Sequence, residues 1–220
     1  MKFIYILCEG ETEEKFVKEL LQPRFWAHDK HLQPVILHTK RDRSGVKFTG
    51  GVSSYEKIRR ELQNLLRDTR AECVTTFLDY YGLPEDFPGK AEMAHRTFKT
   101  PYDRVTHLEE KFAEDIDDRR FLPYIMLHEF EAVLFIDLAE LEEVVGVSPD
   151  SRALGDWQCF SSPEEINDGK DTHPSARLGK AYRGYRKVLH GSQAAMRIGL
   201  ERIREKCSHL DEWIRKLEAL

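Results

Sequence analysis

The feature that most constrains the fold of this sequence is a pair of short apolar runs that each end on an acidic residue. The run over residues 3–8 breaks at Glu9, and the run over residues 73–78 ends on Asp79. Runs of this length and composition are typical of strands that are buried on both faces, as in parallel sheets. A glycine follows each acid within three residues, which lets the backbone turn sharply or approach a ligand closely. The pattern predicts buried strands with carboxylates at their ends, where α/β sheets bind ligands.

The rest of the chain alternates between helical and strand patterns. The predicted elements are, in order, a helix over 13–20, a strand over 34–38, helices over 55–69 and 104–118, a strand over 121–127, and helices over 132–145 and 196–220. This alternation predicts the α/β class, with a mostly parallel central sheet of about four strands flanked by helices. We expect an α/β core at residues 1–147 and a loop-rich, helical C-terminal extension at residues 148–220 that packs on the same domain.

Composition places the chain among globular proteins. Of its 220 residues, 40% are hydrophobic and 33% are charged, and the four cysteines form no CxxC pair. These values exclude a disordered chain, and the cysteine spacing indicates neither a zinc knuckle nor a disulfide framework. The sequence has no apolar run of the roughly 20 residues that cross a bilayer and no signal-peptide pattern, so we expect a cytoplasmic protein without membrane contact.

Acidic residues follow three of the predicted strands. Glu9 and Asp79 end the first and third, and Glu129 and Glu131 come directly after the fourth. Because parallel strands point the same way, their carboxyl ends meet at one edge and bring these side chains together. Clustered carboxylates repel one another unless a cation or a shared proton neutralises them, and such oxygen ligands favour Mg²⁺ or Mn²⁺, which support phosphoryl transfer. The plainer interpretation is that these acids only form turns or decorate helix starts, where the helix dipole favours negative charge.

Local basic residues are candidates for binding a phosphate backbone. The formal net charge of −5 argues against a protein that coats nucleic acid by bulk electrostatics, but a nuclease needs only local positive patches. The residues expected to bind substrate are Lys40, Arg41, His128, Lys170 and Arg177. The alternatives are a solvated basic face for the lysines and arginines, and an ordinary structural histidine for His128.

The order of these motifs resembles a known family. An apolar strand followed by Glu9-Gly10-x-Thr12-Glu13, a later strand that ends on Asp79, and acids after a fourth strand resemble the TOPRIM domain of topoisomerases, primases and OLD-family (overcoming lysogenization defect) nucleases. Four strings are also similar to a bacterial family of unknown function with a TOPRIM-like core, often encoded beside an ATPase in mobile defence loci. These strings are EGETEEKFV, FLDYYGLPEDFPG, LHEFEAVLF and INDGKDTHPSARL. The resemblance covers nearly the whole chain and implies a TOPRIM-like Rossmannoid fold.

The resemblance also implies roles for individual residues. Glu9 would be the general acid/base or a metal ligand, and Asp79 would be the first, metal-binding acid of the Asp-x-Asp motif. Tyr81 stands where that motif has its second acid, and tyrosine is a poor Mg²⁺ ligand. Glu129 and Glu131 are the obvious substitutes as metal ligands. Because residues i and i+2 do not share a helix face, we expect only one to point into the site, and we favour Glu129, with Glu131 as the second candidate.

These observations lead to expectations about activity. The main hypothesis is a Mg²⁺- or Mn²⁺-dependent nuclease that acts on DNA or RNA in bacterial anti-phage or mobile-element defence, with Glu9, Asp79 and Glu129 as catalytic residues. The second is a non-catalytic TOPRIM-like sensor or regulatory partner of an ATPase, which the Tyr81 departure favours. The third is an enzyme that acts on a small phosphate ester. The apolar positions of the predicted helix 196–220 permit docking on the domain or pairing with a partner, including a second copy in a homodimer.

Overall fold

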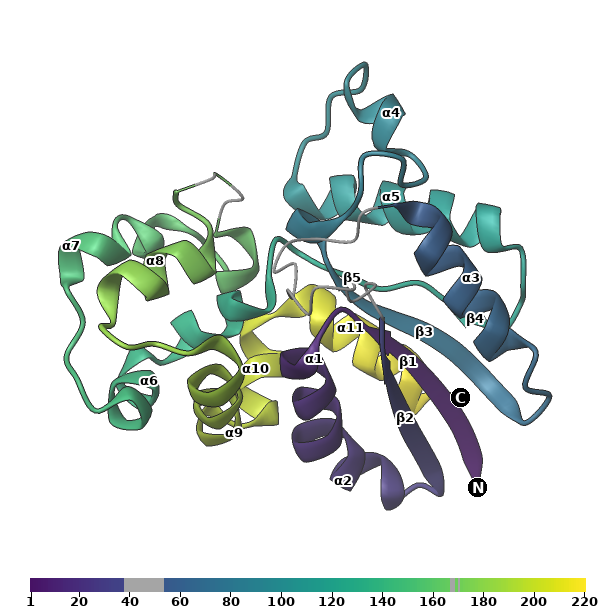
Figure 1. Ribbon diagram of the computed structural model, residues 1–220, viewed down its shortest axis with the longest axis horizontal. Helices are drawn as coiled ribbons and strands as arrows, with labels where there is room; N and C mark the ends of the chain where they lie inside the picture. The colour runs from purple at the N-terminus through teal and green to yellow at the C-terminus, as the bar shows by residue number, and fades with distance from the viewer. Residues whose placement is uncertain (38–53, 167–168, 170) are drawn as a thin grey trace, which may run out of the picture.

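The computed structural model describes residues 1–37, 54–166, 169 and 171–220. At its centre is a sheet with strand order β2-β1-β3-β4, and β5 also pairs with β3 (Figure 1). The strands are β1 (Lys2–Cys8), β2 (Lys30–Ile36), β3 (Ala71–Asp79), β4 (Phe121–Leu122) and β5 (Ile125–Met126). The pairings between these strands are parallel, so the predicted α/β class with a mostly parallel central sheet is confirmed.

Helices flank the sheet and form a lobe beside it (Figure 1). The α-helices are α1 (Glu11–Phe16), α2 (Gln22–Trp26), α3 (Tyr55–Leu66), α4 (Lys90–Met93), α5 (Pro101–Ile116), α6 (Leu138–Val145), α7 (Ser151–Leu154), α8 (Pro174–Ala181), α9 (Ser192–Ile198), α10 (Leu200–Lys206) and α11 (Ser208–Glu218). The 3-10 helices are η2 (Tyr80–Gly82), η3 (Phe130–Ile136), η4 (Trp157–Cys159) and η5 (Pro163–Glu165), and the π-helical turns are η1 (Val17–Leu21) and η6 (Lys187–Gly191). The lobe at the left of Figure 1 contains α6 to α9.

The sheet separates two hydrophobic cores, because neighbouring residues of a strand face opposite sides. Ile4, Ile6 and Phe77 belong to the core that includes side chains of α1, α2 and α11. Leu7 and Leu78 belong to the core that includes side chains of α3 and α5. Both faces of the central strands are therefore covered, which explains why their sequences are apolar almost without interruption.

The C-terminal helices complete the first of these cores. Trp213 in α11 stacks on Tyr124 with ring centroids 4.5 Å apart, and its indole N–H donates a hydrogen bond to the Thr75 hydroxyl at 2.9 Å. Ile214 and Leu217 of the same helix are buried in this core. Residues of the segment 148–220 therefore share a core with the central sheet.

The fourth predicted strand is interrupted. β4 and β5 are two-residue pieces separated by Pro123 and Tyr124, and the proline has no amide to donate. At this break the Thr76 hydroxyl makes two hydrogen bonds to the backbone of Tyr124. It accepts one from the Tyr124 amide at 2.9 Å and donates one to the Tyr124 carbonyl at 2.8 Å.

Two predicted helices are also interrupted. The prediction of one helix over 196–220 is wrong. α9 ends at Ile198, because the next residue, Gly199, has a left-handed φ of +83°, and Cys207 separates α10 from α11. The helix predicted over 132–145 is η3 followed by α6. Asp137 separates them, since its backbone is extended and its side chain caps α6 by accepting the Ala139 amide at 3.1 Å.

The strand order places the carboxyl ends of β1 and β3 beside each other at a switch point. The chain passes from β1 to β2 on one side and then returns to β3 on the other side of β1. Open α/β sheets bind ligands in the crevice at such a reversal. Asp79 ends β3 and Glu9 directly follows β1, so both acids lie at this edge.

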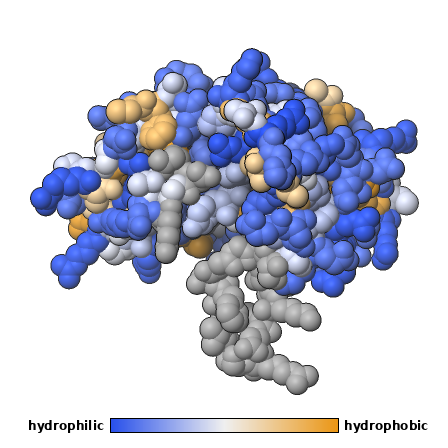
Figure 2. Space-filling model, turned by 90° about the horizontal axis from the view of Figure 1, so that it is seen from above, coloured by the Kyte–Doolittle hydropathy of each residue, from blue (hydrophilic) through white to orange (hydrophobic). Residues whose placement is uncertain are grey.

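The surface is mainly hydrophilic on the face that Figure 2 shows, and the hydrophobic residues there form small, separate groups. Among the described residues, no helix is both long enough and apolar enough to cross a bilayer.

Candidate functional site

The candidate site begins where β1 and β3 end. The backbone amide of Asp79 donates a hydrogen bond to Glu9 Oε2 at 3.1 Å, which joins the two acids directly. Gly82 makes room for this carboxylate, since a Cβ added at Gly82 would lie 2.7 Å from Glu9 Oε1. Asp79 is fixed as well, because its Oδ1 accepts the Phe130 amide at 3.0 Å. The absence of a side chain at Gly82 therefore permits the close approach of Glu9.

A lysine joins Asp79 to a third acid. Lys187, the first residue of η6, places its ammonium 2.9 Å from Glu131 Oε2 and 3.6 Å from Asp79 Oδ2. The Glu131 side chain is 0% exposed, whereas 40% of the Lys187 side chain is exposed. Carboxylates from β3 and η3 thus share one positive charge, which reduces their mutual repulsion.

Glu13 in α1 contributes a fourth carboxylate, which is buried. Its Oε2 accepts the Gly10 amide at 2.9 Å, which is a capping contact at the start of the helix. Oε1 of Glu13 and Oε1 of Glu131 are buried and accept no hydrogen bond from the described part of the chain. Buried oxygens without a donor are costly in an ordinary core and retain the capacity to bind a cation.

We refer to Glu9, Glu13, Asp79 and Glu131 as the acid cluster. Burial is the main cause that raises the pKa of each, to about 7 for Glu131, and the ammonium of Lys187 opposes all four shifts. Burial alone would lower the pKa of Lys187, but the neighbouring carboxylates outweigh it and hold that pKa well above its ordinary value. One ammonium cannot neutralise four carboxylates, so the raised pKa values favour a proton on some of them unless a cation binds.

Glu129, the partner for Asp79 that the sequence favoured, has different contacts. Its Oε2 accepts the Ser175 amide at 2.8 Å and lies 3.0 Å from His173 Nδ1, and its Oε1 accepts the Ser175 hydroxyl at 2.9 Å. Ser175 is in the first turn of α8, where the helix dipole favours a negative charge. Glu129 therefore connects the end of the sheet to α8, while Glu131 meets Lys187.

The turn that follows Asp79 is aromatic. Tyr81 is 48% exposed, and its ring stacks on His173 with centroids 4.8 Å apart. The Tyr81 amide donates to the His128 carbonyl at 3.1 Å, and the His128 ring lies edge-on to the Tyr80 ring. His128 is buried and has a left-handed φ of +60°, which is uncommon for a residue with a side chain. His128 thus packs against the η2 turn.

The other predicted substrate-binding residues are not part of this arrangement. Lys40, Arg41 and Lys170 lie outside the described residues. Arg177 is buried, and its guanidinium donates to the Leu154 carbonyl at 2.6 Å. Its other partners are the Thr172 carbonyl and the Asp156 carboxylate, so Arg177 connects α8 to the end of α7 and the residues after it.

Lys187 belongs to the candidate site although no sequence motif includes it, and Glu13 belongs to it although it was not among the predicted site residues. Glu13 fits an ordinary helix start, and Lys187 lies far along the chain from the acids that it contacts. The only sequence signal for Lys187 is that it ends a locally basic segment, residues 180–187, of an acidic chain. His173 and Ser175 lie in the polar string INDGKDTHPSARL, but their contact with Glu129 requires the folded chain.

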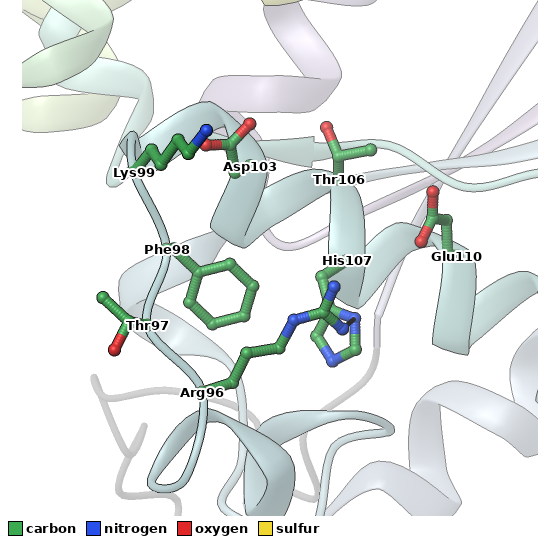
Figure 3. Close-up of a pocket in the computed structure, with 8 residues that line it drawn as sticks. All are labelled: Arg96, Thr97, Phe98, Lys99, Asp103, Thr106, His107 and Glu110. Atoms are coloured by element: carbon green, nitrogen blue, oxygen red, sulfur yellow. Dashed lines mark hydrogen bonds between the residues drawn. The ribbon is translucent and has the colours of Figure 1, made fainter.

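A separate cavity of about 410 Å³ is formed by α5 and the loop before it (Figure 3). Its charged lining residues are Arg96, Lys99, Asp103 and Glu110. The Arg96 guanidinium lies over the Phe98 ring and 3.0 Å from His107 Nδ1. Because positive and negative side chains are mixed in its lining, the cavity favours no particular ligand charge, and it includes no residue of the acid cluster.

Comparison with known proteins identifies the family of the chain. No curated protein and no solved structure matched the chain. The sequence profile of the domain of unknown function DUF4276 matches residues 8–218, a range that includes the acid cluster and Lys187. The chain therefore belongs to the DUF4276 family of domains of unknown function.

Proposed function

We propose that the protein is a Mg²⁺- or Mn²⁺-dependent nuclease with a TOPRIM-like core, which hydrolyses phosphodiester bonds of DNA or RNA. One observation carries the proposal: Asp79 and Glu131, from separate elements at the switch point, both lie within 3.6 Å of a single ammonium. Carboxylates buried this close together are costly in an ordinary core and are usual where a protein binds a cation. The resemblance to families encoded beside ATPases supports a role in bacterial anti-phage or mobile-element defence.

The donor set fits a hard divalent cation. The acid cluster offers carboxylate oxygens, two of which are buried and accept no hydrogen bond from the described residues. Asp79 and Glu131 would hold the ion, with Glu9 and Glu13 beside them. In the described ranges no three Asp, Glu, His or Cys side chains are grouped so that they could hold a metal ion as they stand, so binding requires Lys187 or the carboxylates to shift. When bound, Mg²⁺ or Mn²⁺ polarises the scissile phosphate and lowers the pKa of an attacking water.

Glu9 is suited to transfer a proton at the leaving oxygen. One of its oxygens is oriented by the Asp79 amide, and the other lies against Gly82. Burial raises the pKa of Glu9, which increases the protonated fraction near neutral pH. A carboxyl group with such a pKa can donate a proton to a leaving oxygen and accept one from water. We therefore assign Glu9 as the general acid/base, and Glu129 as a positioning residue that orients His173.

Cleavage assays with the purified protein test this function. Supercoiled plasmid, single-stranded DNA and RNA are incubated with Mg²⁺ or Mn²⁺ and with wild type, Asp79→Asn, Glu9→Gln or Glu143→Gln, an exposed control. We expect metal-dependent cleavage that is lost in the first two variants and kept in the control, with circular dichroism of folded protein in all cases. Full activity of both site variants would remove the acid cluster from the reaction.

A second candidate is a non-catalytic sensor or regulatory partner of an ATPase. Two observations favour it: Tyr81 stands where the TOPRIM pattern has its second acid, and Lys187 already neutralises part of the acid cluster. Such a module has no need to bind a metal ion. Calorimetric titration with Mn²⁺ separates the candidates, because binding that disappears in Asp79→Asn supports the nuclease and no binding by the wild type supports the partner.

A further inference from the structure

Tyr81 exposes an aromatic ring beside the acid cluster. The residue is 48% exposed and stands two positions after Asp79, in the η2 turn. The next large apolar side chains of the same loop, Leu83 and Phe87, are only 5% and 2% exposed. Tyr81 is therefore not part of the buried core that these two side chains join.

The Tyr81 ring is held in one orientation. It stacks on the imidazole of His173 with centroids 4.8 Å apart and an angle of 24° between the planes. His173 is fixed in turn, because its Nδ1 lies 3.0 Å from Glu129 Oε2 and 3.1 Å from the Ser175 hydroxyl. Only 14% of the His173 side chain is exposed. One face of the tyrosine ring is therefore covered by a fixed partner, and the exposed part is a flat surface that is already oriented.

A surface of this kind suits an unpaired nucleobase. Stacking of a base on an aromatic side chain is favourable for every base, and a ring that is already fixed loses little conformational entropy on binding. Bases inside a duplex are stacked on one another and offer no free face until they are unpaired. Because Tyr81 is so close to Asp79 in the chain, a nucleotide stacked on Tyr81 would lie beside the acid cluster.

Positive side chains are available for the backbone of such a strand. Arg183 and Arg186 are exposed and lie between α8, which begins next to His173, and Lys187. The acid cluster by itself repels phosphates, so a bound strand needs cationic partners in its neighbourhood. Both arginines lie within four residues of Lys187 in the chain, which makes them candidates for these partners.

We infer that Tyr81 and His173 form a stacking platform for an unpaired nucleobase, so that the substrate of the candidate site is single-stranded nucleic acid. The inference rests on the proposed function for the kind of ligand and adds its substrate class. Tyr81 and His173 are positioning residues, since they orient the strand and do not act on the phosphate.

Binding measured without cleavage tests the platform. Fluorescence anisotropy in EDTA follows a labelled single-stranded DNA, the matching RNA and a hairpin duplex of the same sequence. We expect the single strands to bind more tightly than the duplex, Tyr81→Ala to weaken single-strand binding by roughly 5- to 100-fold, and Tyr81→Phe to retain it. Trp26→Ala is the matched control and should bind as the wild type does, because Trp26 is 58% exposed but ends α2, near the amino end of β2.

A spectroscopic measurement separates stacking from a general effect on structure. Tyr81→Trp places an indole at the same position, and bound single strand should quench its fluorescence beyond the change seen with the three tryptophans of the wild type. Equal single-strand affinity of Tyr81→Ala and wild type would overturn the platform. The same holds if Tyr81→Trp forms a complex without added quenching, or if the wild type binds no nucleic acid.

The platform and the nuclease can fail separately. Asp79→Asn should bind single strands at least as well as the wild type while it loses cleavage. Binding that depends on Tyr81, in a protein that never cleaves, would support the platform and reject the nuclease. Cleavage that depends on Asp79 but proceeds equally well in Tyr81→Ala on every substrate would reject the platform alone.

Discussion

Two glutamates of this protein, Glu164 and Glu131, are both 0% exposed, yet their surroundings differ. The Glu164 carboxylate accepts the backbone amides of His209 and Leu210 at 3.1 and 3.0 Å, at the start of α11. The Tyr102 hydroxyl donates a third hydrogen bond to it at 3.3 Å. Burial raises the pKa of Glu164, but these hydrogen bonds oppose the shift. Glu164 is thus a buried acid whose charge is met by a helix N-terminus.

Glu131 has no comparable set of donors among the residues that the structure describes. Its charged partner is the ammonium of Lys187, and its Oε1 accepts no hydrogen bond from the described residues. Burial raises its pKa to about 7. A buried carboxylate that only stabilises a fold accepts hydrogen bonds at both oxygens. A carboxylate that binds a cation needs an oxygen that accepts none. By this criterion Glu164 is a structural residue, and Glu131 is the candidate metal ligand under the proposed function.

The largest expected effect is a difference in cleavage activity between variants of the two glutamates. Glu131→Gln should lower metal-dependent cleavage by on the order of 100-fold or more, because it removes a ligand charge from the acid cluster. Glu164→Gln should leave the rate unchanged and lower the free energy of unfolding by about 1–3 kcal/mol, since one hydrogen-bonded oxygen becomes a donor. Initial cleavage rates and urea unfolding curves of both variants measure this. Equal losses of activity would show that the comparison is not valid.

The second expected effect concerns pH. The folded-state pKa of Glu131 is about 7 against an ordinary value of 4.5, so its protonated form is favoured in the folded state. The protonated Glu131 therefore contributes to the free energy of unfolding fully below about pH 4.5. This contribution, at most about 3 kcal/mol, is lost as pH rises through 7. In metal-free buffer, Glu131→Gln should remove this loss. Urea unfolding at several pH values between 4.5 and 8 measures it, and identical slopes for variant and wild type would contradict the burial argument.

Lys187→Met tests the same comparison by removing the counter-ion of Glu131. Removing the ammonium leaves Asp79 and Glu131 facing each other, which should destabilise the metal-free protein by about 2 kcal/mol, a figure reduced because 40% of the lysine is exposed. Mn²⁺ should then raise the melting temperature more in the variant than in the wild type. Lys180→Met is the control, because Lys180 pairs with the exposed Asp171. Equal responses of the two variants to Mn²⁺ would reject Lys187 as the resident counter-ion.

The smallest expected effect comes from a single methyl group. Gly82→Ala would place a Cβ against the Glu9 carboxylate and displace it, so cleavage should fall by about 10-fold while the acid cluster keeps its charge. Gly179→Ala in α8 is the control, since a Cβ there meets nothing within 4 Å. Steady-state rates of both variants measure the effect. An active Gly82→Ala protein would mean that the position of Glu9 is not critical.

The part of the site formed by strand ends could be predicted from sequence. Glu9 and Asp79 each follow an apolar run, and strands buried on both faces favour a parallel sheet that brings their ends together. The hydrogen bond from the Asp79 amide to Glu9 agrees with that expectation. The helix breaks at Gly199 and Cys207 were not predicted, because the apolar spacing of residues 196–220 continues across both positions.

The rest of the site depends on contacts between distant segments. Glu129 and Glu131 are equivalent in a helical pattern, and only the docking of α8 and η6 decides that Glu129 meets Ser175 while Glu131 meets Lys187. Glu13 looks like a capping residue and is one, yet its second oxygen is buried beside the other acids. The partners of these acids are decided by tertiary packing, which local sequence patterns do not predict.

The position of α11 sets a limit on when one face of the sheet can be covered during synthesis. Trp213 and its buried neighbours cover the face of the sheet that carries Ile4, Ile6 and Phe77. Until the ribosome has made residues 208–218, this face lacks one of its covering helices. A chain stalled before that point presents apolar surface of the kind that chaperones and proteases recognise.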